Sequence, residues 1–223
     1  AVEGDKRRAW GVACAYKNTG FGSGAYDAAG AEVEVFANGR AIVRAGAAEI
    51  GQGLVGVLAQ IVSEELGVPY AQVDVLVSDT DLTPDGLATT ASRQTYVTGN
   101  AARYASQEVR ALLSQTAAEM LDAPPESLIF TEGSVRSNPV SRGANGSRSV
   151  PLSEVVKTAR REGRMPKVSY QYVAPACREY QHFAFGFGAQ AALVEVDVKT
   201  GETKVLTVIA ANDVGRVINP LAL

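Results

Sequence analysis

The segment Glu49-Ile50-Gly51-Gln52-Gly53 places two glycines and a carboxamide directly before a predicted helix. Glycine lets a backbone approach a ligand closely, and a helix N-terminus offers unpaired N–H groups and a partial positive charge to an anion. The Gln52 side chain adds both a donor and an acceptor. The pattern predicts contacts to a phosphate, a metal oxo group or a pterin edge, although a plain strand–turn–helix connection explains it equally well.

A second segment, Thr89–Gly99, gathers hydroxyl groups, an arginine and an amide ahead of the next predicted helix. Its central residues are Ala91, Ser92, Arg93 and Gln94. Side-chain oxygens and free N–H groups at a helix start can hold a ligand, but they also form ordinary Ser/Thr capping loops. Two such helix starts together fit an elongated ligand with a phosphate at one end and many hydrogen-bonding atoms along its length.

Residues that bind metals are scarce. Cys14, Cys177 and the single histidine, His182, form neither a CxxC pair nor a zinc-ligand cluster, and they are too few for an iron–sulfur cluster. We therefore predict that the chain itself holds no metal and that both thiols are inert and buried. The aromatic–glycine alternation over residues 181–190 is a third candidate for chemistry, but it also fits a strand with close backbone packing.

The composition of the 223 residues is that of an ordinary globular protein, with 46% hydrophobic and 20% charged residues. A net charge of -3 disfavours a nucleic-acid partner, which would require a basic face. No apolar run is long enough to span a membrane, and no signal peptide is recognised, so the expected location is the cytoplasm. The start at Ala1 instead of Met suggests a processed product or a truncated piece.

The first half of the chain alternates strands with one helix. A strand is expected over residues 9–17, and runs over 31–36 and 41–43 around Asn38-Gly39 predict a hairpin with a type I′ turn. An apolar stripe over Leu54–Leu66 predicts a helix that Gly67 and Pro69 end. The next strand is Val73–Val77.

The second half begins with a polar stretch over residues 78–99, followed by a helix from Ala101 to Leu121. Residues 137–149 predict a surface loop, and the domain could subdivide near 137–150. The remaining predicted elements are a helix from Pro151 to Arg161 and strands at 167–173, 191–198 and 203–211. Since strand pairs alternate with isolated helices, we expect an α+β fold: two-layer sandwiches of mixed β-sheet with helices on one face.

Four motifs follow one another in a fixed order. These are Glu49-Ile50-Gly51-Gln52-Gly53, then Thr90-Ala91-Ser92-Arg93-Gln94 with Gly99, then Phe185-Gly186-Phe187 with Val194-Glu195-Val196-Asp197 and Thr200-Gly201, and finally Asp213-Val214-Gly215 with Ile218-Asn219-Pro220. In this order the chain resembles the molybdopterin-binding (large) subunit of the xanthine dehydrogenase and aldehyde oxidase family of molybdenum hydroxylases. The resemblance covers nearly the whole chain, and it implies a molybdenum-cofactor-binding-domain fold.

The resemblance implies molybdopterin or molybdopterin cytosine dinucleotide, whose dithiolene, not the protein, holds the molybdenum. By similarity, the cofactor-binding residues are Gly51, Gln52, Gly53, Ala91, Ser92, Arg93 and Gln94. Residues 1–223 are then a partial domain, truncated at both ends relative to the family. The family's catalytic glutamate is expected beyond the C-terminus, so no residue here is assigned as catalytic. The isolated chain is expected to be inactive and without cofactor.

The family's reaction is the hydroxylation of an aldehyde or a purine-like N-heterocycle with water as the oxygen source. The implied partners are the remainder of the molybdenum subunit, iron–sulfur and FAD subunits or domains, and a small-molecule substrate. Self-association of the isolated chain is also expected, because a partial domain exposes apolar surface. The alternatives are a non-catalytic homologue that keeps the fold without cofactor, and a nucleotide-binding domain, which the missing P-loop lysine disfavours.

Overall fold

The centre of the molecule is a four-stranded mixed sheet with two helices on one face. The computed structural model describes residues 4–137, 148–176 and 182–221. The sheet has the order β4-β3-β2-β8. Its strands are β2 (Ala28–Val35), β3 (Ala41–Ala45), β4 (Val73–Val77) and β8 (Lys167–Val173). Only β3 and β4 are parallel, and the other neighbours are antiparallel. This architecture confirms the predicted α+β class.

The helices α1 (Leu54–Leu66) and α2 (Gln94–Leu121) cover this sheet. The alternating residues Val33, Val35 and Val43 point toward them and are fully buried. Each such valine contributes about 1.5–3 kcal/mol relative to an exposed one. The period-two pattern of the strands therefore sets which face of the sheet receives the helices.

The predicted helix over Leu54–Leu66 is confirmed at both ends. Its C-terminal residue is followed by Gly67 with φ +62°. A Cβ at Gly67 would lie 2.3 Å from the carbonyl carbon of Phe130, so only glycine fits this turn. The short 3-10 helix Tyr70–Gln72 then leads into β4.

The second predicted helix was placed too late, because α2 begins at Gln94 instead of Ala101. Its first two turns are polar in sequence but buried in the structure, as Thr98 and Gly99 show. A Cβ at Gly99 would lie 3.0 Å from the Cδ1 atom of Ile61 on α1. Close packing between the helices thus selects small residues where the sequence lacks an apolar stripe.

The hairpin between β2 and β3 is confirmed, but its predicted type I′ turn is wrong. The chain turns over residues 36–40, with Phe36 and Arg40 joined by a backbone hydrogen bond of 2.9 Å. Gly39 has φ +85°, whereas Asn38 is not among the residues with positive φ. A type I′ turn requires positive φ at both central positions. The connection over residues 36–40 is longer than a type I′ turn, and Gly39 is its one residue with a left-handed φ.

A small second sheet lies at one end of α2. Its strands, in the order β5-β6-β7, are β5 (Leu128–Thr131), β6 (Ser134–Ser137) and β7 (Ser149–Pro151). The 3-10 helix Pro125–Ser127 precedes it, and α3 (Leu152–Arg161) follows. Pro151 stands directly before the helix instead of in its first turn. Most of the predicted loop at 137–149 lies outside the described residues, and a subdivision near 137–150 stays a prediction.

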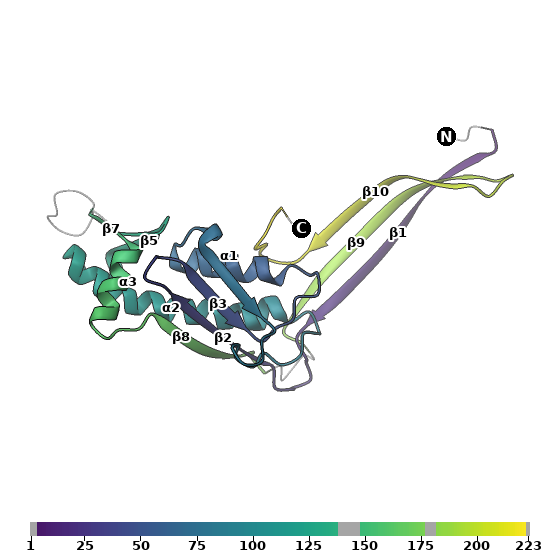
Figure 1. The fold of residues 1–223 in the computed structure, drawn as a ribbon. Coiled ribbons are helices and arrows are strands. Elements are labelled where there is room, and N and C mark those ends of the chain that lie inside the picture. Colours follow the sequence, from purple (N-terminus) through teal and green to yellow (C-terminus); the bar gives the residue numbers. More distant parts are fainter. Residues whose placement is uncertain (1–3, 138–147, 177–181, 222–223) are drawn as a thin grey trace.

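The third sheet is an arm that projects from the body (Figure 1). It consists of β1 (Lys6–Thr19), β9 (Ala184–Asp197) and β10 (Thr203–Asp213), all antiparallel, with β9 in the middle. These strands are longer than the predicted ones, and a separate arm was not predicted. The aromatic–glycine segment is a strand from Ala184 onward, which supports the simpler of its two interpretations.

Both faces of the arm are largely exposed. Val12 and Ile209 flank Ala191 on one face, and they are 72% and 54% exposed. Near the far end, Glu195 on β9 forms ion pairs with Lys6 at 3.0 Å and Arg8 at 2.7 Å on β1. The arm is therefore held by its backbone ladder and cross-strand pairs instead of by a core. None of the helices in the described residues is long and apolar enough to cross a membrane.

Candidate functional site

The two helices that follow the predicted ligand-binding segments run side by side and begin at the same end. Gly99, early in α2, lies against Ile61 of α1. Further along, Arg103 Nε donates to Glu65 Oε1 at 2.9 Å and Arg110 Nη1 donates to the Glu65 carbonyl at 3.1 Å. Because the positions advance together along both helices, α1 and α2 are parallel. Their N-terminal ends, and the partial positive charge of each, are therefore neighbours.

A chain of hydrogen bonds connects the loops that precede these helices. Gln52 Nε2 donates to the Ala48 carbonyl at 2.9 Å, and the Ala48 N–H donates to Thr89 Oγ1 at 2.8 Å. Gln94 Nε2 donates to the same hydroxyl oxygen at 3.0 Å. The two segments singled out in the sequence are thus brought together. They are joined by Thr89, the first residue of the second segment, which was not among the predicted cofactor-binding residues.

The start of α1 is capped by its own chain. Glu49 Oε1 accepts hydrogen bonds from the N–H groups of Gly51 at 2.8 Å and Gly53 at 3.0 Å, and Oε2 accepts from Val55 at 3.0 Å. These backbone hydrogen bonds, with that of Val55 the largest, lower the pKa of Glu49 below its usual value of 4.5. A carboxylate already occupies the place where a phosphate was predicted, so this helix start is not free to bind an anion.

The Gly51-Gln52-Gly53 turn nevertheless presents an open surface. Gly51 and Gly53 have φ of +99° and +83°, and a Cβ on either would meet no atom within 4 Å. Gln52 is exposed, and its Oε1 accepts from the Ile50 N–H at 2.7 Å. One N–H and one oxygen lone pair of this amide remain for a ligand. The turn therefore fits contact with the edge of a hydrogen-bonding ring better than contact with a phosphate.

The start of α2 is different. Ala91 and Ser92 both adopt left-handed φ values, +52° and +51°, directly before it. Arg93 is the N-cap residue, and no side chain in the described parts of the chain caps the helix by a hydrogen bond. The Ser92 side chain is exposed beside the first turn. This end therefore combines helix N–H groups with an exposed hydroxyl, a donor set that suits a phosphate.

Arg93 and Gln94 lie beneath this surface. Arg93 has no exposed area, and Gln94 is 6% exposed. Arg93 Nε pairs with Asp27 Oδ1 at 2.6 Å, while Gln94 bonds to Thr89 and accepts from the hydroxyl of Thr98. Their side chains are thus engaged within the protein, whereas Gly51, Gln52, Gly53 and Ser92 are exposed and Ala91 is partly exposed. No sequence signal links Asp27 to Arg93, because 66 residues separate them.

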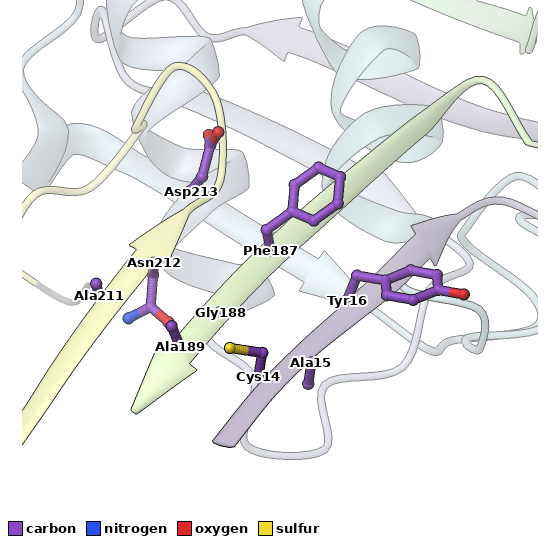
Figure 2. Close-up of a pocket in the computed structure, with 9 residues that line it drawn as sticks. All are labelled: Cys14, Ala15, Tyr16, Phe187, Gly188, Ala189, Ala211, Asn212 and Asp213. Atoms are coloured by element: carbon purple, nitrogen blue, oxygen red, sulfur yellow. The ribbon is translucent and has the colours of Figure 1, made fainter. Parts of the chain in front are cut away.

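An open pocket of about 650 Å³ lies on the arm (Figure 2). Cys14 and Tyr16 of β1, Phe187 of β9, and Asn212 and Asp213 of β10 contribute to its lining. The Tyr16 and Phe187 ring centroids are 6.3 Å apart. Cys14 is a free, exposed thiol, so the prediction that it is buried is wrong, because the arm has no core to enclose it. Cys177 lies outside the described residues.

The single histidine, His182, lies between a polar and an aromatic side chain of the arm. Asn18 Nδ2 lies 3.1 Å from His182 Nδ1, and the His182 ring packs edge-on against Phe185. Within the described residues there is no group of three or more His, Cys, Asp or Glu side chains that could hold a metal ion. The donors of the candidate site are amides, a hydroxyl and helix N–H groups, a set whose chemistry suits an organic ligand.

Known proteins are similar to this chain in sequence. A family model described as a molybdopterin cofactor-binding domain matches residues 1–223. The chain is 35% identical over 205 residues to the 6-hydroxypseudooxynicotine dehydrogenase complex subunit gamma of Paenarthrobacter nicotinovorans, covering 90% of this chain and 24% of that protein. It is 30% identical over 220 residues to the xanthine dehydrogenase molybdenum-binding subunit of Escherichia coli O157:H7, covering 98% of this chain and 28% of that protein.

A solved structure with the same fold is that of quinoline 2-oxidoreductase from Pseudomonas putida 86. It superposes with a TM-score of 0.80 at 26% identity, over 98% of this chain and 28% of that one. The chain therefore spans about a quarter of the length of the relatives that it matches.

Proposed function

Because the chain belongs to the family of molybdopterin cofactor-binding domains, we propose that its paired helix starts form one side of a molybdenum-cofactor site in a larger oxidoreductase. The observation that carries this proposal is the juxtaposition of the open Gly51-Gln52-Gly53 turn with the uncapped start of α2. One presents an amide and bare backbone, and the other presents helix N–H groups and a hydroxyl. An elongated pterin phosphate needs both kinds of contact.

The two ends of the site have different roles in this proposal. Gln52 donates to and accepts from the edge of the pterin, and the adjacent glycines allow the ring system to approach the backbone. Ala91, Ser92 and the first N–H groups of α2 receive the phosphate. When bound, the cofactor supplies molybdenum chemistry, in which two electrons are removed from a substrate carbon and an oxygen from water is added.

For the whole protein, we propose hydroxylation of an N-heterocycle or an aldehyde. Two similar proteins are named for xanthine and quinoline, both of which are N-heterocycles. A relative at 30% identity is instead named for carbon monoxide, so the substrate must be decided by assay. The assembled enzyme, given quinoline, hypoxanthine, benzaldehyde or carbon monoxide with an artificial electron acceptor, is expected to oxidise a heterocycle fastest. Exclusive oxidation of carbon monoxide would refute this proposal.

The arm is proposed to dock on the remainder of the molybdenum subunit. Trp10, Val12 and Tyr16 are between 53% and 72% exposed, and exposed apolar surfaces mark interaction sites. The names of two similar proteins describe them as subunits, which supports further subunits as partners, and the family resemblance implies that these carry iron–sulfur clusters and FAD. The isolated chain is expected to self-associate through the same surface. A monomer by light scattering at high concentration would contradict this.

Metal and pterin content test the cofactor proposal directly. The full-length subunit, coexpressed with its partners, is expected to contain molybdenum and to release a pterin on denaturation. Gln52→Ala and Ser92→Ala should lower both contents, whereas Gln115→Ala and Ser114→Ala on α2 serve as matched controls away from the site. An assembled wild-type complex with neither metal nor pterin would identify the chain as a non-catalytic relative that keeps only the fold.

A further inference from the structure

We propose that Arg93 and Asp27 are a positioning pair that holds the Ala91–Ser92 turn and the start of α2 in the geometry that receives the cofactor. This inference rests on the proposed function and changes the part assigned to Arg93. The sequence resemblance implies that Arg93 contacts the cofactor. Its burial assigns it instead to the support beneath the contact surface.

The guanidinium of Arg93 connects the start of β2 with the loop before α2. Its Nε donates to Asp27 Oδ1 at 2.6 Å, and its Nη2 donates to the Ala28 carbonyl at 2.6 Å, at the start of β2. Its Nη1 donates to the carbonyls of Gly86 at 2.8 Å and Ala88 at 2.9 Å, in the loop before α2. The planar fork of arginine makes these bonds in fixed directions, which a lysine could not reproduce.

Asp27 extends the same support to the base of the arm. Its second oxygen, Oδ2, accepts from the Phe21 N–H at 3.0 Å, and the Phe21 ring lies 4.8 Å from the Arg93 guanidinium carbon. The Gly20 N–H then donates to the Ala91 carbonyl at 3.0 Å. The turn that precedes α2 is thus held from below by Arg93 and from the side by the end of β1.

The turn requires such support because its conformation is unfavourable by itself. Ala91 and Ser92 both have positive φ, which L-residues with a Cβ rarely adopt. Strained backbone of this kind persists only where the surrounding structure determines it. Since Arg93 follows Ser92 directly and is also the N-cap of α2, loss of its bonds would release the turn and move the helix N–H groups together.

The test uses the full-length complex and separates positioning from plain stability. Arg93→Met is compared with the double variant Asp27→Leu/Arg93→Met, because an apolar pair can replace a buried ion pair without loss of stability. Val43→Ala, in the core of the sheet, is the matched destabilised control. The readouts are molybdenum per subunit and, in complex prepared without cofactor, hydrogen exchange of the backbone N–H groups of residues 91–96.

We expect Arg93→Met to lower the molybdenum content per subunit and to accelerate exchange over residues 91–96, because the released turn no longer presents the helix N–H groups in one geometry. The double variant should be more heat-stable than the single one while metal content stays low and exchange stays fast. Val43→Ala should keep the wild-type molybdenum content and the wild-type exchange rate over residues 91–96. Normal metal content and slow exchange in either Arg93 variant would overturn the inference.

The two proposals fail in different ways. A wild-type complex without molybdenum would refute the proposed function alone. The exchange measurement needs no cofactor, so it still decides whether the pair sets the turn. Metal loss in Val43→Ala as severe as in Arg93→Met, at equal melting temperature, would show that the pair acts only through stability.

Discussion

The starts of α1 and α2 lie next to each other, but a side chain in the described part of the protein caps the first and not the second. At α1, the Glu49 carboxylate accepts hydrogen bonds from three N–H groups. At α2, no described side chain caps the helix, and a buried ion pair supports the turn from below. A helix start is therefore available to an external anion only where the protein does not supply its own. Sequence motifs alone did not distinguish these two cases.

The largest expected effect comes from breaking the support beneath α2. Arg93→Ala leaves Asp27 buried without its partner and should lower the free energy of unfolding by about 3–5 kcal/mol. Urea denaturation measures this. The control is Arg103→Ala, whose ion pair with Glu65 is half exposed and should contribute less than about 1 kcal/mol. Equal effects of the two substitutions would remove the distinction between buried and surface pairs.

A second substitution tests whether close packing holds the two helix starts together. Gly99→Leu forces a larger side chain against Ile61, whose Cδ1 atom already lies 3.0 Å from where a Cβ would stand. We expect a loss of about 1–3 kcal/mol from overpacking, measured by thermal unfolding. Ile61→Ala in the same protein should restore part of the loss by making room. Unchanged stability in Gly99→Leu would mean that the helices separate freely.

The strained turn before α2 offers a smaller, opposite effect. Ser92→Gly removes the cost of about 1–2 kcal/mol of a left-handed residue with a Cβ. It also adds about 0.5–1 kcal/mol of backbone entropy to be lost on folding, so the net stabilisation should be about 0.5–1 kcal/mol. Ser114→Gly, within α2, should instead destabilise it by about 0.5–1 kcal/mol. Chemical denaturation of both variants gives the comparison, and a loss of stability in Ser92→Gly would contradict the assigned φ.

The smallest effect is the pH dependence of the cap on α1. Since folding lowers the pKa of Glu49, its contribution to stability is complete above the unfolded value of 4.5 and is lost as the pH falls through the folded pKa. Wild-type protein should therefore melt higher than Glu49→Gln at pH 7, and the difference should shrink below pH 4.5. Gln115→Ala, on the exposed face of α2, removes no titrating group, so its melting temperature should differ from that of wild type by the same amount at both pH values. A constant difference between wild type and Glu49→Gln would exclude the carboxylate as the cap.

The sequence predicted those parts of the fold that local patterns determine. The helix Leu54–Leu66 has a clean apolar stripe and a terminal glycine, and the strand Lys167–Val173 is bounded in the structure as in the prediction. The start of α2 was missed because packing against Ile61, not apolarity, selects its residues. The arm was missed because antiparallel pairing between distant segments leaves no local signal beyond alternation.

The sequence predicted which two segments form the candidate site, but not which of their side chains are exposed and which are buried. Motif order indicated the two segments, and Thr89 joins them in the structure. Which side chains face outward depends on partners far away in the sequence. Arg93 is buried in an ion pair with Asp27, and no residue near position 93 in the sequence indicates that burial. Roles of individual ligand-binding residues are still predictions that the proposed variants would test.

The pairing of β1 with β9 has a consequence for how the molecule is assembled. Thr19 and Ala184 are partners in the β1–β9 ladder, yet the residues between them in the sequence form the central sheet, the second sheet and the helices α1, α2 and α3. Closing so long a loop is entropically costly until the intervening chain is compact. We therefore expect β1 to stay unpaired until the central sheet and its helices have formed, so that the β1–β9 pairing of the arm forms last. A body that folds slowly would leave an unpaired, apolar strand open to aggregation for the same length of time.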